Sequence, residues 1–489
     1  MTVDPVLLIA IPLVSAFLTP LISLLSRKAS RWVPLLGVIG MAGVMALLFG
    51  DLYDGAVTST TGGFDPPYGI SIVMTPLGGI ISTGMILVAL FVILSDLGGG
   101  RKFRVVYDTM VMMGTAGAVG MVITGDIFNM FVFLEITSIA GVVLAAIPRE
   151  GEEKGLNWRG AASYAIMGTV ASFVVLAGIG LLYSATSTLN IARMVERIGE
   201  VDPFVLGTAF MAMFVGLGIE AELFPLNGWA PEVYKGSRWG TSSLFSGVIG
   251  KAGLIALVRI VFTVIGPAVE GGMASEILLW TGVITFLFGE AAAFTSKDVN
   301  RMLGYSSVGV FGLLAASFSL GSGEGIRAAV LQIIGHMLAK PLLFSVMGHI
   351  GIKGDAPLSS LKGLSGSSPT AAALLTVGAL ALIGMPPSPN FGGKFFFFTG
   401  AGDRWLVIGL VVIGTLMEAG YVARLLYNVH SRKGDEDRKP ISVARGITGV
   451  FAALLIVSMG LFPGLLEGIL DLVVSALTDP SIYSGWGVF

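Results

Sequence analysis

Residues 216–231 read Gly-Leu-Gly-Ile-Glu-Ala-Glu-Leu-Phe-Pro-Leu-Asn-Gly-Trp-Ala-Pro and interrupt a long apolar segment. A second interruption, at residues 384–394, reads Gly-Met-Pro-Pro-Ser-Pro-Asn-Phe-Gly-Gly-Lys. Proline removes a backbone donor and clashes with the preceding turn, so a helix must open at each place. In lipid, freed carbonyl groups are tolerated only where they face protein or water. The two stretches therefore predict two broken membrane helices with a polar site between two repeats, and simple packing kinks are the alternative.

The composition indicates a polytopic membrane protein. Of 489 residues, 54% are hydrophobic and only 12% are charged, and the mean hydropathy is +0.87. Soluble domains carry about 25% charged residues. Cysteine is absent, which excludes disulfides, thiolate-bound zinc and iron–sulfur clusters held by this chain. No phosphate-binding P-loop or HExxH pair is present. We therefore expect no cofactor, no metal, no nucleic-acid partner and no catalysis by this chain alone.

Hydropathy predicts about 14 membrane spans, each near the roughly 20 residues that cross the hydrocarbon. The first apolar run has no small-residue cleavage site, so it is expected to be a span and not a removable signal. The tail after residue 465 is too polar for a further crossing. The expected limits are 5–25, 31–50, 70–95, 105–123, 126–147, 160–184, 203–224, 241–266, 273–294, 301–320, 326–351, 368–388, 403–429 and 442–464.

The basic residues predict the orientation. If the N-terminus lies outside, 19 of the 29 Lys and Arg residues fall in connections on one side of the membrane. The other side receives only Arg193, Arg197, Arg327 and Arg404. Connections rich in Lys and Arg stay in the cytoplasm. We therefore expect a multi-pass protein of the cell membrane with both termini outside.

Ionisable residues stand inside the predicted spans. A charge at the centre of a membrane helix costs roughly 2.5 to 3.5 kcal/mol. Several such residues spread over the chain indicate a polar route for ions or protons within a helix bundle, with structural ion pairs as the alternative. A histidine and a lysine four residues apart share one helix face, as a relay requires. The candidate residues are Glu135, Glu220, Lys251, His336, Lys340, Lys394 and Glu418. We expect Glu290 to lie near a membrane face, outside this set.

Five stretches, in order and suitably spaced over roughly residues 70–430, resemble one known family. It comprises the antiporter-like subunits of respiratory complex I, of Mrp cation/proton antiporters and of membrane-bound hydrogenase or sulfane-reductase complexes. The stretches are Phe128–Ile136 around Glu135, Ser246–Arg259 around Lys251, Lys297–Ser307, His336–Phe344 around Lys340, and Gly384–Lys394.

The resemblance implies an all-α fold of two inverted five-helix repeats, each with a broken helix. The first repeat (helices 4–8) would span residues 105–266 and the second (helices 9–13) residues 273–429. Residues 1–104 would form three N-terminal helices, and residues 430–489 a C-terminal helix and tail. The resemblance also implies a line of charged residues at mid-membrane, in which one charge change alters the pKa of the next group.

The chain departs from the family pattern in its first half. Glu220 stands where the family usually has a lysine, Asn227 where a histidine is common, and Ser163 where a lysine often precedes Tyr164. The usual Glu–Lys pair between spans five and seven therefore cannot form. If Glu135 faces Glu220, two like charges meet, with Lys251 as the nearest cation.

The resemblance implies an ion-translocating subunit, for protons or sodium or both, of a multisubunit redox-driven membrane complex. Its partners would be other membrane subunits, including antiporter-like paralogues, and peripheral redox subunits. The stretch Met417–Tyr427 resembles the hydrogenase and sulfane-reductase branch. Three alternatives stay open: a subunit of an Mrp-type sodium/proton antiporter, a non-transporting coupling or assembly subunit, which Glu220 favours, and a lone secondary transporter.

Overall fold

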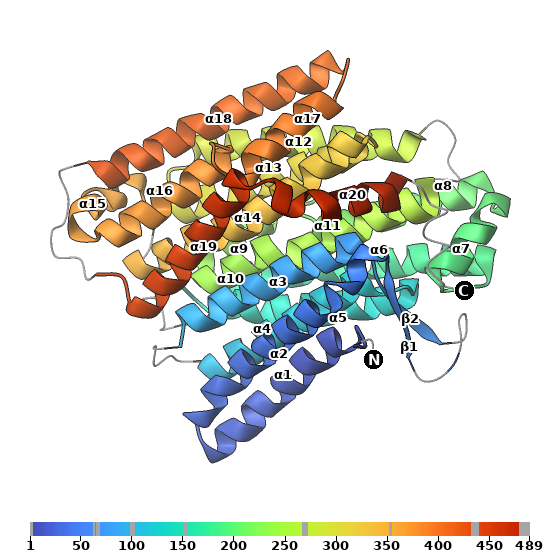
Figure 1. Ribbon diagram of the computed structural model, residues 1–489, viewed down its shortest axis with the longest axis horizontal. Coiled ribbons are helices and arrows are strands. Elements are labelled where there is room, and N and C mark those ends of the chain that lie inside the picture. The colour runs from blue at the N-terminus through green and yellow to red at the C-terminus, as the bar shows by residue number, and fades with distance from the viewer. Residues whose placement is uncertain are drawn as a thin grey trace.

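The protein is an almost entirely helical membrane bundle (Figure 1). The computed structural model describes residues 3–61, 64, 69–97, 103–149, 155–266, 272–351, 355–431 and 440–478. Within these ranges, 13 helices are long and apolar enough to cross a membrane. The broken pair α16 and α17 supplies one further crossing, so the prediction of a polytopic all-α fold with about 14 spans is confirmed.

The N-terminal helices are α1 (Leu7–Leu25), α2 (Trp32–Leu48) and α3 (Pro76–Ser95). A short 3₁₀ turn, η2 (Asp51–Tyr53), and an antiparallel hairpin of β1 (Val57–Thr61) and β2 (Ile70–Met74) connect α2 to α3. The expected limits 70–95 for the third span are therefore wrong at their start. The β-branched residues of 70–74 pair as a strand, and α3 begins only at Pro76, where the Thr75 hydroxyl accepts a hydrogen bond from Gly78 N at 3.1 Å.

Two groups of five crossings follow, and in each group the fourth member is broken. The first group contains α4 (Arg104–Ile123), α5 (Ile127–Ala146), α6 (Trp158–Thr186), α8 (Pro203–Glu220) and a continuous segment of α10 (Trp239–Leu244), η4 (Phe245–Ile249), α11 (Gly250–Arg259) and η5 (Ile260–Ile265). The second contains α12 (Met273–Thr295), α13 (Val299–Ser319), α14 (Gly323–Ile350), α16 (Pro369–Ile383) with α17 (Pro389–Gly400), and α18 (Trp405–His430). The broken members are an odd number of crossings apart, so they run in opposite directions, as inverted repeats require.

Short elements fill the connections. The helix α7 (Ile191–Arg197) and the turn η3 (Ile198–Glu200) precede α8, and α9 (Ala230–Gly236) follows its break. The turn η8 (Leu358–Leu361) and α15 (Leu364–Ser367) precede α16. In Figure 1 the hairpin and α7 lie at the right-hand end of the molecule and α15 at the left-hand end. These connections lie at the two ends of the bundle.

The last crossing, α19 (Val443–Leu461), is followed by a further helix, α20 (Gly464–Thr478). The sequence predicts only a polar tail after residue 465. In the structure this segment forms a helix whose Asp471 is ion-paired with Arg327 of α14, and whose Gly468 lies against Tyr53. Its apolar residues pack against α3 and α14, which accounts for the helix in a segment that also carries acidic residues.

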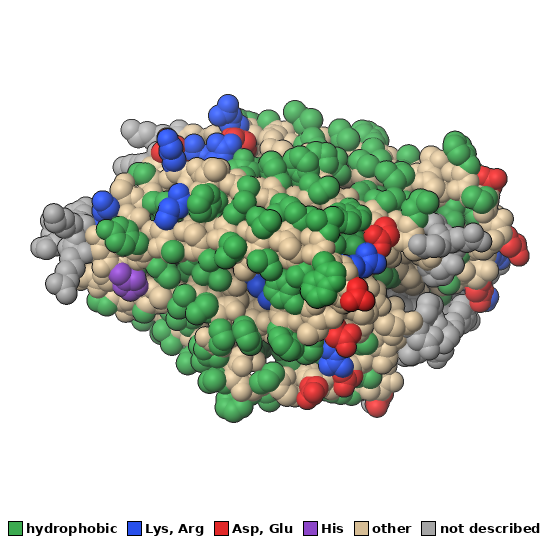
Figure 2. Space-filling view, turned by 90° about the horizontal axis from the view of Figure 1, so that it is seen from above, with side chains coloured by type: hydrophobic (Ala, Val, Ile, Leu, Met, Phe, Trp, Pro, Cys, Tyr) green, Lys and Arg blue, Asp and Glu red, His purple; other side chains and the backbone are tan. Residues whose placement is uncertain are grey.

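The middle of the bundle is shielded from lipid. The apolar windows of Trp239–Ile265, α13 and α14 are each 94% buried, whereas those of the outer helices α1 and α19 are 33% and 28% buried. On the face drawn in Figure 2, hydrophobic side chains are spread over the whole width of the molecule, and most of the acidic side chains lie toward the right-hand part. Charged residues on the central helices are therefore enclosed by protein.

Helices α12 and α13 touch backbone to backbone. A Cβ added at Gly312 would lie 2.3 Å from the Phe286 nitrogen, and one at Gly289 would lie 2.3 Å from the Gly309 nitrogen. Such close approach is possible only between small residues. It also encloses the acidic residue next to Gly289.

Candidate functional site

The seven ionisable residues predicted from the sequence come from six helices. Lys251, His336 and Lys340 are fully buried, and Glu220 and Glu418 are 2% and 1% exposed. The Lys394 side chain is 11% exposed, and Glu135 is half-buried. None of them points freely into lipid, so each must be satisfied by other parts of the protein.

The first pair of carboxylates is bound by hydroxyl groups. The Ser172 hydroxyl of α6 donates to Glu135 of α5. Glu220, the last residue of α8, accepts hydrogen bonds from Ser138 Oγ at 2.8 Å and from Tyr164 Oη at 2.9 Å. The charges of Glu135 and Glu220 interact. The two acids thus lie near each other, as the departures from the family pattern suggest. The groups that bind the Glu220 carboxylate are neutral hydroxyl donors and not a lysine.

A recess of about 290 Å³ lies beside Glu135, between α5 and α6. Ser138 and Ser172 line it together with Glu135, and Phe131 and Phe173 form part of its apolar wall. Glu135 is therefore accessible through this recess from the side of the molecule.

Glu222 belongs with these residues, although sequence reasoning did not select it. It lies in the break after α8 with φ of 57°, in the left-handed region that costs a non-glycine residue roughly 1–2 kcal/mol. Its side chain is fully buried and accepts a hydrogen bond from Tyr234 Oη at 2.7 Å. Its cationic neighbours are Lys251 and Lys340. The sequence predicts that Lys251 compensates Glu220, but the carboxylate neighbour of Lys251 is Glu222.

Lys251 and His336 contact the same aromatic ring. Lys251 Nζ lies 3.6 Å from the centre of the Phe311 ring, and the His336 ring packs edge-on against Phe311 at 6.2 Å between centres. Neither Lys251 Nζ nor either ring nitrogen of His336 has a hydrogen-bond partner within the part of the chain that the structure describes. A cation that leaves water loses the stabilisation of hydration, and contact with an aromatic face restores part of it.

Lys340 occupies the next position along α14. Its ammonium group donates to the Leu303 carbonyl of α13 at 2.7 Å. Its charge interacts with Glu290, Glu418 and Glu222. Lys340 therefore connects the acid of the first break with the acids of the second half.

Lys394 of α17 forms a buried ion pair in the second half. Its ammonium group donates to the Ile383 carbonyl at 2.8 Å and is hydrogen-bonded to the Glu418 carboxylate of α18. The sequence is compatible with two roles for this lysine, a charge in a relay and a cap on opened backbone. In the structure the Lys394 ammonium group makes both contacts at once, one to the Ile383 carbonyl and one to the Glu418 carboxylate.

Glu290 of α12 is fully buried and lies among these residues, in contrast to the expectation that places it outside the set. Its charge interacts with Glu418, Lys394 and Lys340. Its two carboxylate oxygens have no partner of hydrogen-bond geometry among the described residues, and the nearby Tyr421 hydroxyl donates to Ser306 Oγ at 2.7 Å. The close contact of α12 with α13 encloses Glu290 against Gly309.

The polar backbone groups freed at the breaks are paired by side chains. Trp229 Nε1 donates to the Ile219 carbonyl at 3.1 Å, and Asn390 Nδ2 donates to the Ala381 carbonyl at 2.8 Å. The Phe224 nitrogen donates to Thr285 Oγ1 at 3.0 Å. In the described ranges, no group of three or more His, Asp or Glu side chains is arranged to hold a metal ion. The site is a line of separate charges and hydrogen bonds.

Comparison with known proteins assigns the family. Residues 124–418 match the model of the NADH:quinone oxidoreductase/Mrp antiporter transmembrane family. The chain belongs to this family of antiporter-like membrane subunits. It is 30% identical over 440 residues to NADH-quinone oxidoreductase subunit N of Desulforudis audaxviator, a match that covers 87% of the chain and 86% of that protein. It is 27% identical over 495 residues to a Na(+)/H(+) antiporter protein of Bacillus subtilis, with 98% of each covered.

Solved structures agree with this assignment. A chain of the membrane-bound sulfane sulfur reductase, an archaeal respiratory membrane complex, superposes with a TM-score of 0.91 at 29% identity, with 99% of each chain covered. A chain of the Mrp complex from Dietzia sp. superposes with a TM-score of 0.89 at 21% identity over the whole of both chains, which establishes likeness of fold. The antiporter-like resemblance seen in the sequence motifs is thus confirmed.

We expect the Lys394–Glu418 pair to show strong energetic coupling. Removing one partner of a buried pair costs about 3–5 kcal/mol, because the other charge stays buried and unpaired. Lys394→Gln and Glu418→Gln should each lower the thermal unfolding midpoint of the purified protein, and the double variant should be less destabilised than the sum of the two. Tryptophan fluorescence recorded during heating measures the unfolding midpoint of each variant.

The exposed pair Arg404–Glu276 is the matched control, because both side chains are 43% exposed. Exposed pairs contribute about 0–1 kcal/mol. The Arg404→Gln and Glu276→Gln cycle should therefore be close to additive. Additive behaviour of the Lys394 and Glu418 variants as well would show that the buried contact is not coupled.

Proposed function

We propose that this chain is an ion-translocating subunit of a multisubunit, redox-driven membrane complex and moves protons or sodium ions along its buried charged line. The observation that carries the proposal is the continuity of that line. Charge interactions connect Glu135 to Glu220, Glu220 to Glu222, and Glu222 to Lys251 and Lys340. Lys340 interacts in turn with Glu290 and Glu418, and both of these acids interact with Lys394. A change of charge on one such group alters the protonation of its neighbours without a large movement of the helices.

A polar recess of about 570 Å³ supports access to this line from one end of the bundle. Its wall includes Tyr305 of α13, whose carbonyl oxygen lies 2.8 Å from a Cβ placed at Gly289, the residue before Glu290. Lys235 at its rim donates to Asp355 at 2.8 Å, and this hydrogen bond lowers the pKa of Asp355, so that the carboxylate stays charged. We propose that ions or protons reach Glu290 through this recess.

Two findings favour a redox-driven complex over an Mrp-type antiporter. The chain is 29% identical to the matched chain of the sulfane sulfur reductase complex and 21% identical to that of the Mrp complex. Among curated relatives, it is 30% identical to the oxidoreductase subunit N and 27% identical to the Bacillus subtilis antiporter protein. The partners that we propose are therefore other membrane subunits, antiporter-like paralogues among them, and peripheral redox subunits.

Substitution of the central lysines should slow transport. In liposomes that contain the purified complex, Lys251→Met and Lys340→Met should each slow ion translocation about tenfold or more. Lys251→Met removes the cation next to Glu222, and Lys340→Met removes the cation that interacts with Glu222, Glu290 and Glu418. Glu222→Gln, which removes the carboxylate next to Lys251, should also slow it. A pH-sensitive dye and a sodium-flux assay, run in parallel, measure the rate and identify the ion.

Lys362→Met is the control, because Lys362 is exposed in the connection before α16. The complex that carries this substitution should translocate ions at the rate of the unaltered complex. If all three buried variants also keep that rate while the complex stays assembled, the chain is a coupling or assembly subunit. Glu220, held by Ser138 and Tyr164 without a cation, is the observation that keeps this second function under consideration.

Copurification should separate the two kinds of complex. An affinity tag on this chain, used under mild detergent, should recover subunits that contain iron–sulfur clusters or nickel, detectable by metal analysis and mass spectrometry. Recovery of small membrane subunits alone, with no metal, would identify an Mrp-type sodium/proton antiporter and overturn the redox-driven assignment.

The orientation can be tested directly because the chain has no native cysteine. We propose that the connection with α7 lies outside and the connection with η8 in the cytoplasm of a cell-membrane protein. A membrane-impermeant maleimide added to intact cells should label Glu196→Cys and not Ser359→Cys, both at exposed positions. After the cells are opened, both should react. The reverse pattern would place both termini in the cytoplasm.

A further inference from the structure

Phe311 of α13 contacts one member of the charged line from each half of the chain. Its side chain is fully buried. The Lys251 ammonium group of α11 stands 3.6 Å from the centre of the Phe311 ring, and the His336 ring of α14 packs against the same ring at an angle of 67°. Three helices thus bring an amine, an imidazole and a phenyl ring together. Of these three groups, only the phenyl ring has no atom that can take up or release a proton.

A glycine makes room for this ring. A Cβ added at Gly250, the residue before Lys251, would lie 2.5 Å from Cζ at the tip of the Phe311 ring. Carbon atoms in contact are normally about 3.5–4.0 Å apart, so any side chain at this position would push the ring aside. The ring therefore fills the space beside Lys251 as far as the backbone of α11.

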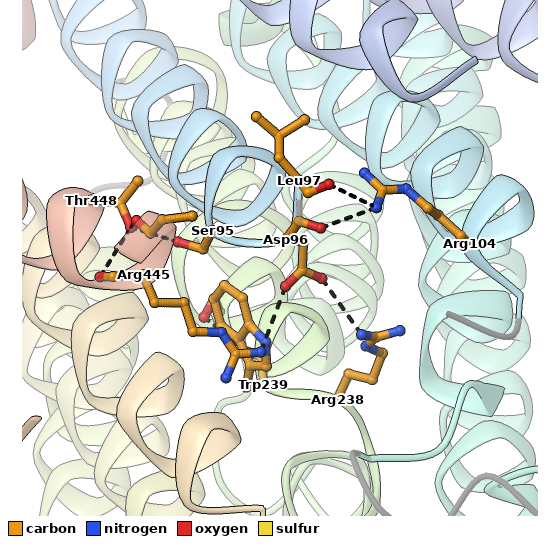
Figure 3. Close-up of polar contacts among 10 residues, drawn as sticks. Ser95, Asp96, Leu97, Arg104, Arg238, Trp239, Arg445 and Thr448 are labelled. Carbon is orange, nitrogen blue, oxygen red and sulfur yellow. Dashed lines mark hydrogen bonds and ion pairs between the residues drawn. The ribbon is translucent and has the colours of Figure 1, made fainter. Parts of the chain in front are cut away.

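The helices around the ring are held in place. On α13, a Cβ at Gly312 would lie 2.3 Å from the Phe286 nitrogen, so this helix touches the α12 backbone directly after Phe311. The segment that carries Lys251 is anchored where it begins, because Arg238 at the start of α10 pairs with Asp96 at 3.5 Å (Figure 3). Turning one side chain displaces fewer packed atoms than shifting a helix does. The ring is therefore the part of this contact that can move.

The ring separates two kinds of coupling between Lys251 and His336. Electrostatic interactions act through space, and the charges of these two groups interact. A proton moves only between groups that are hydrogen-bonded directly or through water. Within the described ranges, no hydrogen bond links Lys251 Nζ or the His336 ring nitrogens to another group, and the phenyl ring supplies no such link. With the ring in this position, the two groups influence each other by charge but do not exchange a proton.

We propose that Phe311 is a barrier that prevents protons from crossing between Lys251 and His336 while it leaves the charges of the two halves coupled. The ring must turn away from Lys251 before a proton can pass. Without such a barrier, protons would flow back along the line and dissipate the gradient. Phe311 takes no proton itself and acts as a positioning residue. This inference rests on the proposed ion transport and adds the residue that prevents a leak.

The test is the passive proton leak of the complete complex in liposomes, measured at rest. A potassium diffusion potential set with valinomycin drives proton entry, and a pH-sensitive dye inside the liposomes reports the rate. Phe311→Ala should raise this rate about tenfold or more, because the space of the lost ring can admit waters, each of about 30 Å³, beside the polar groups. Phe311→Leu keeps an apolar side chain and should leak close to the unaltered rate.

A substitution at Gly250 tests the barrier without changing the ring. Gly250→Ala should displace the ring tip and raise the leak, and it serves if Phe311→Ala does not assemble. Gly250→Ala combined with Phe311→Leu should leak less than Gly250→Ala alone, since the shorter side chain no longer meets the added methyl group. A general loss of packing predicts the opposite order, with the double variant leaking more.

Two further variants show whether the leak follows the charged line. Phe318→Ala removes the same side chain from another buried position of α13 and should leave the leak unaltered. Lys251→Met added to Phe311→Ala should abolish the new leak, because the path runs through Lys251. An unaltered leak in both Phe311→Ala and Gly250→Ala, an equal leak in Phe318→Ala, or a leak that persists without Lys251 would each overturn the barrier. The proposed transport fails by a separate result, unaltered driven translocation in the three buried variants described above.

Discussion

The structure depends on the pairing of backbone groups that two broken helices release inside a membrane bundle. Without water, an unpaired carbonyl costs several kcal/mol. Lys394 donates to the Ile383 carbonyl, Asn390 donates to the Ala381 carbonyl, and Trp229 donates to the Ile219 carbonyl. The residue that closes the second break is therefore also one of the charges of the line. Because one ammonium group serves both purposes, the position of the charge is fixed by the geometry of the helix end.

The two breaks have opposite charges at the same kind of helix end, and their surroundings show how each charge is accommodated. The C-terminal end of a helix carries a partial negative charge and favours a cation. At the end of α16 the cation is Lys394, with Glu418 as its counter-ion. At the end of α8 the chain has Glu220, which this field disfavours. The hydroxyl groups of Ser138 and Tyr164 offset that effect by donating to both carboxylate oxygens. The loss of the usual lysine is thus accommodated locally by neutral donors.

Much of this arrangement could be predicted from the sequence, because hydropathy and proline position depend on local chemistry alone. The spans, the two breaks and the burial of Lys251, His336 and Lys340 follow from such patterns. Glu290 could not be placed in this way. It stands near the end of its span, and only the backbone contact of α12 with α13 at Gly289 and Gly309 encloses it. Glycines on both expected spans were the available signal for that contact.

Glu222 and the β-hairpin were missed for other reasons. The side chain of Glu222 reaches Tyr234 from a left-handed backbone conformation, which no periodicity in the sequence encodes. The hairpin strand at residues 70–74 is as apolar as a membrane helix, and hydropathy alone does not distinguish the two. In both cases a three-dimensional contact, the tyrosine for Glu222 and the partner strand for the hairpin, decided the local structure.

The ends and the middle of the charged line differ in how they are held. Glu220 and Lys394 near the ends each have two hydrogen-bond partners, whereas Lys251 and His336 in the middle contact Phe311 without a hydrogen bond from the described residues. A buried charge is most sensitive to its neighbours where hydrogen bonds do not fix it, because the field of each nearby group is then the main determinant of its protonation. Under the proposed function, the middle is where a change at either end has the largest effect. Under the same proposal, hydrogen bonds hold the end groups in place while the central groups change charge.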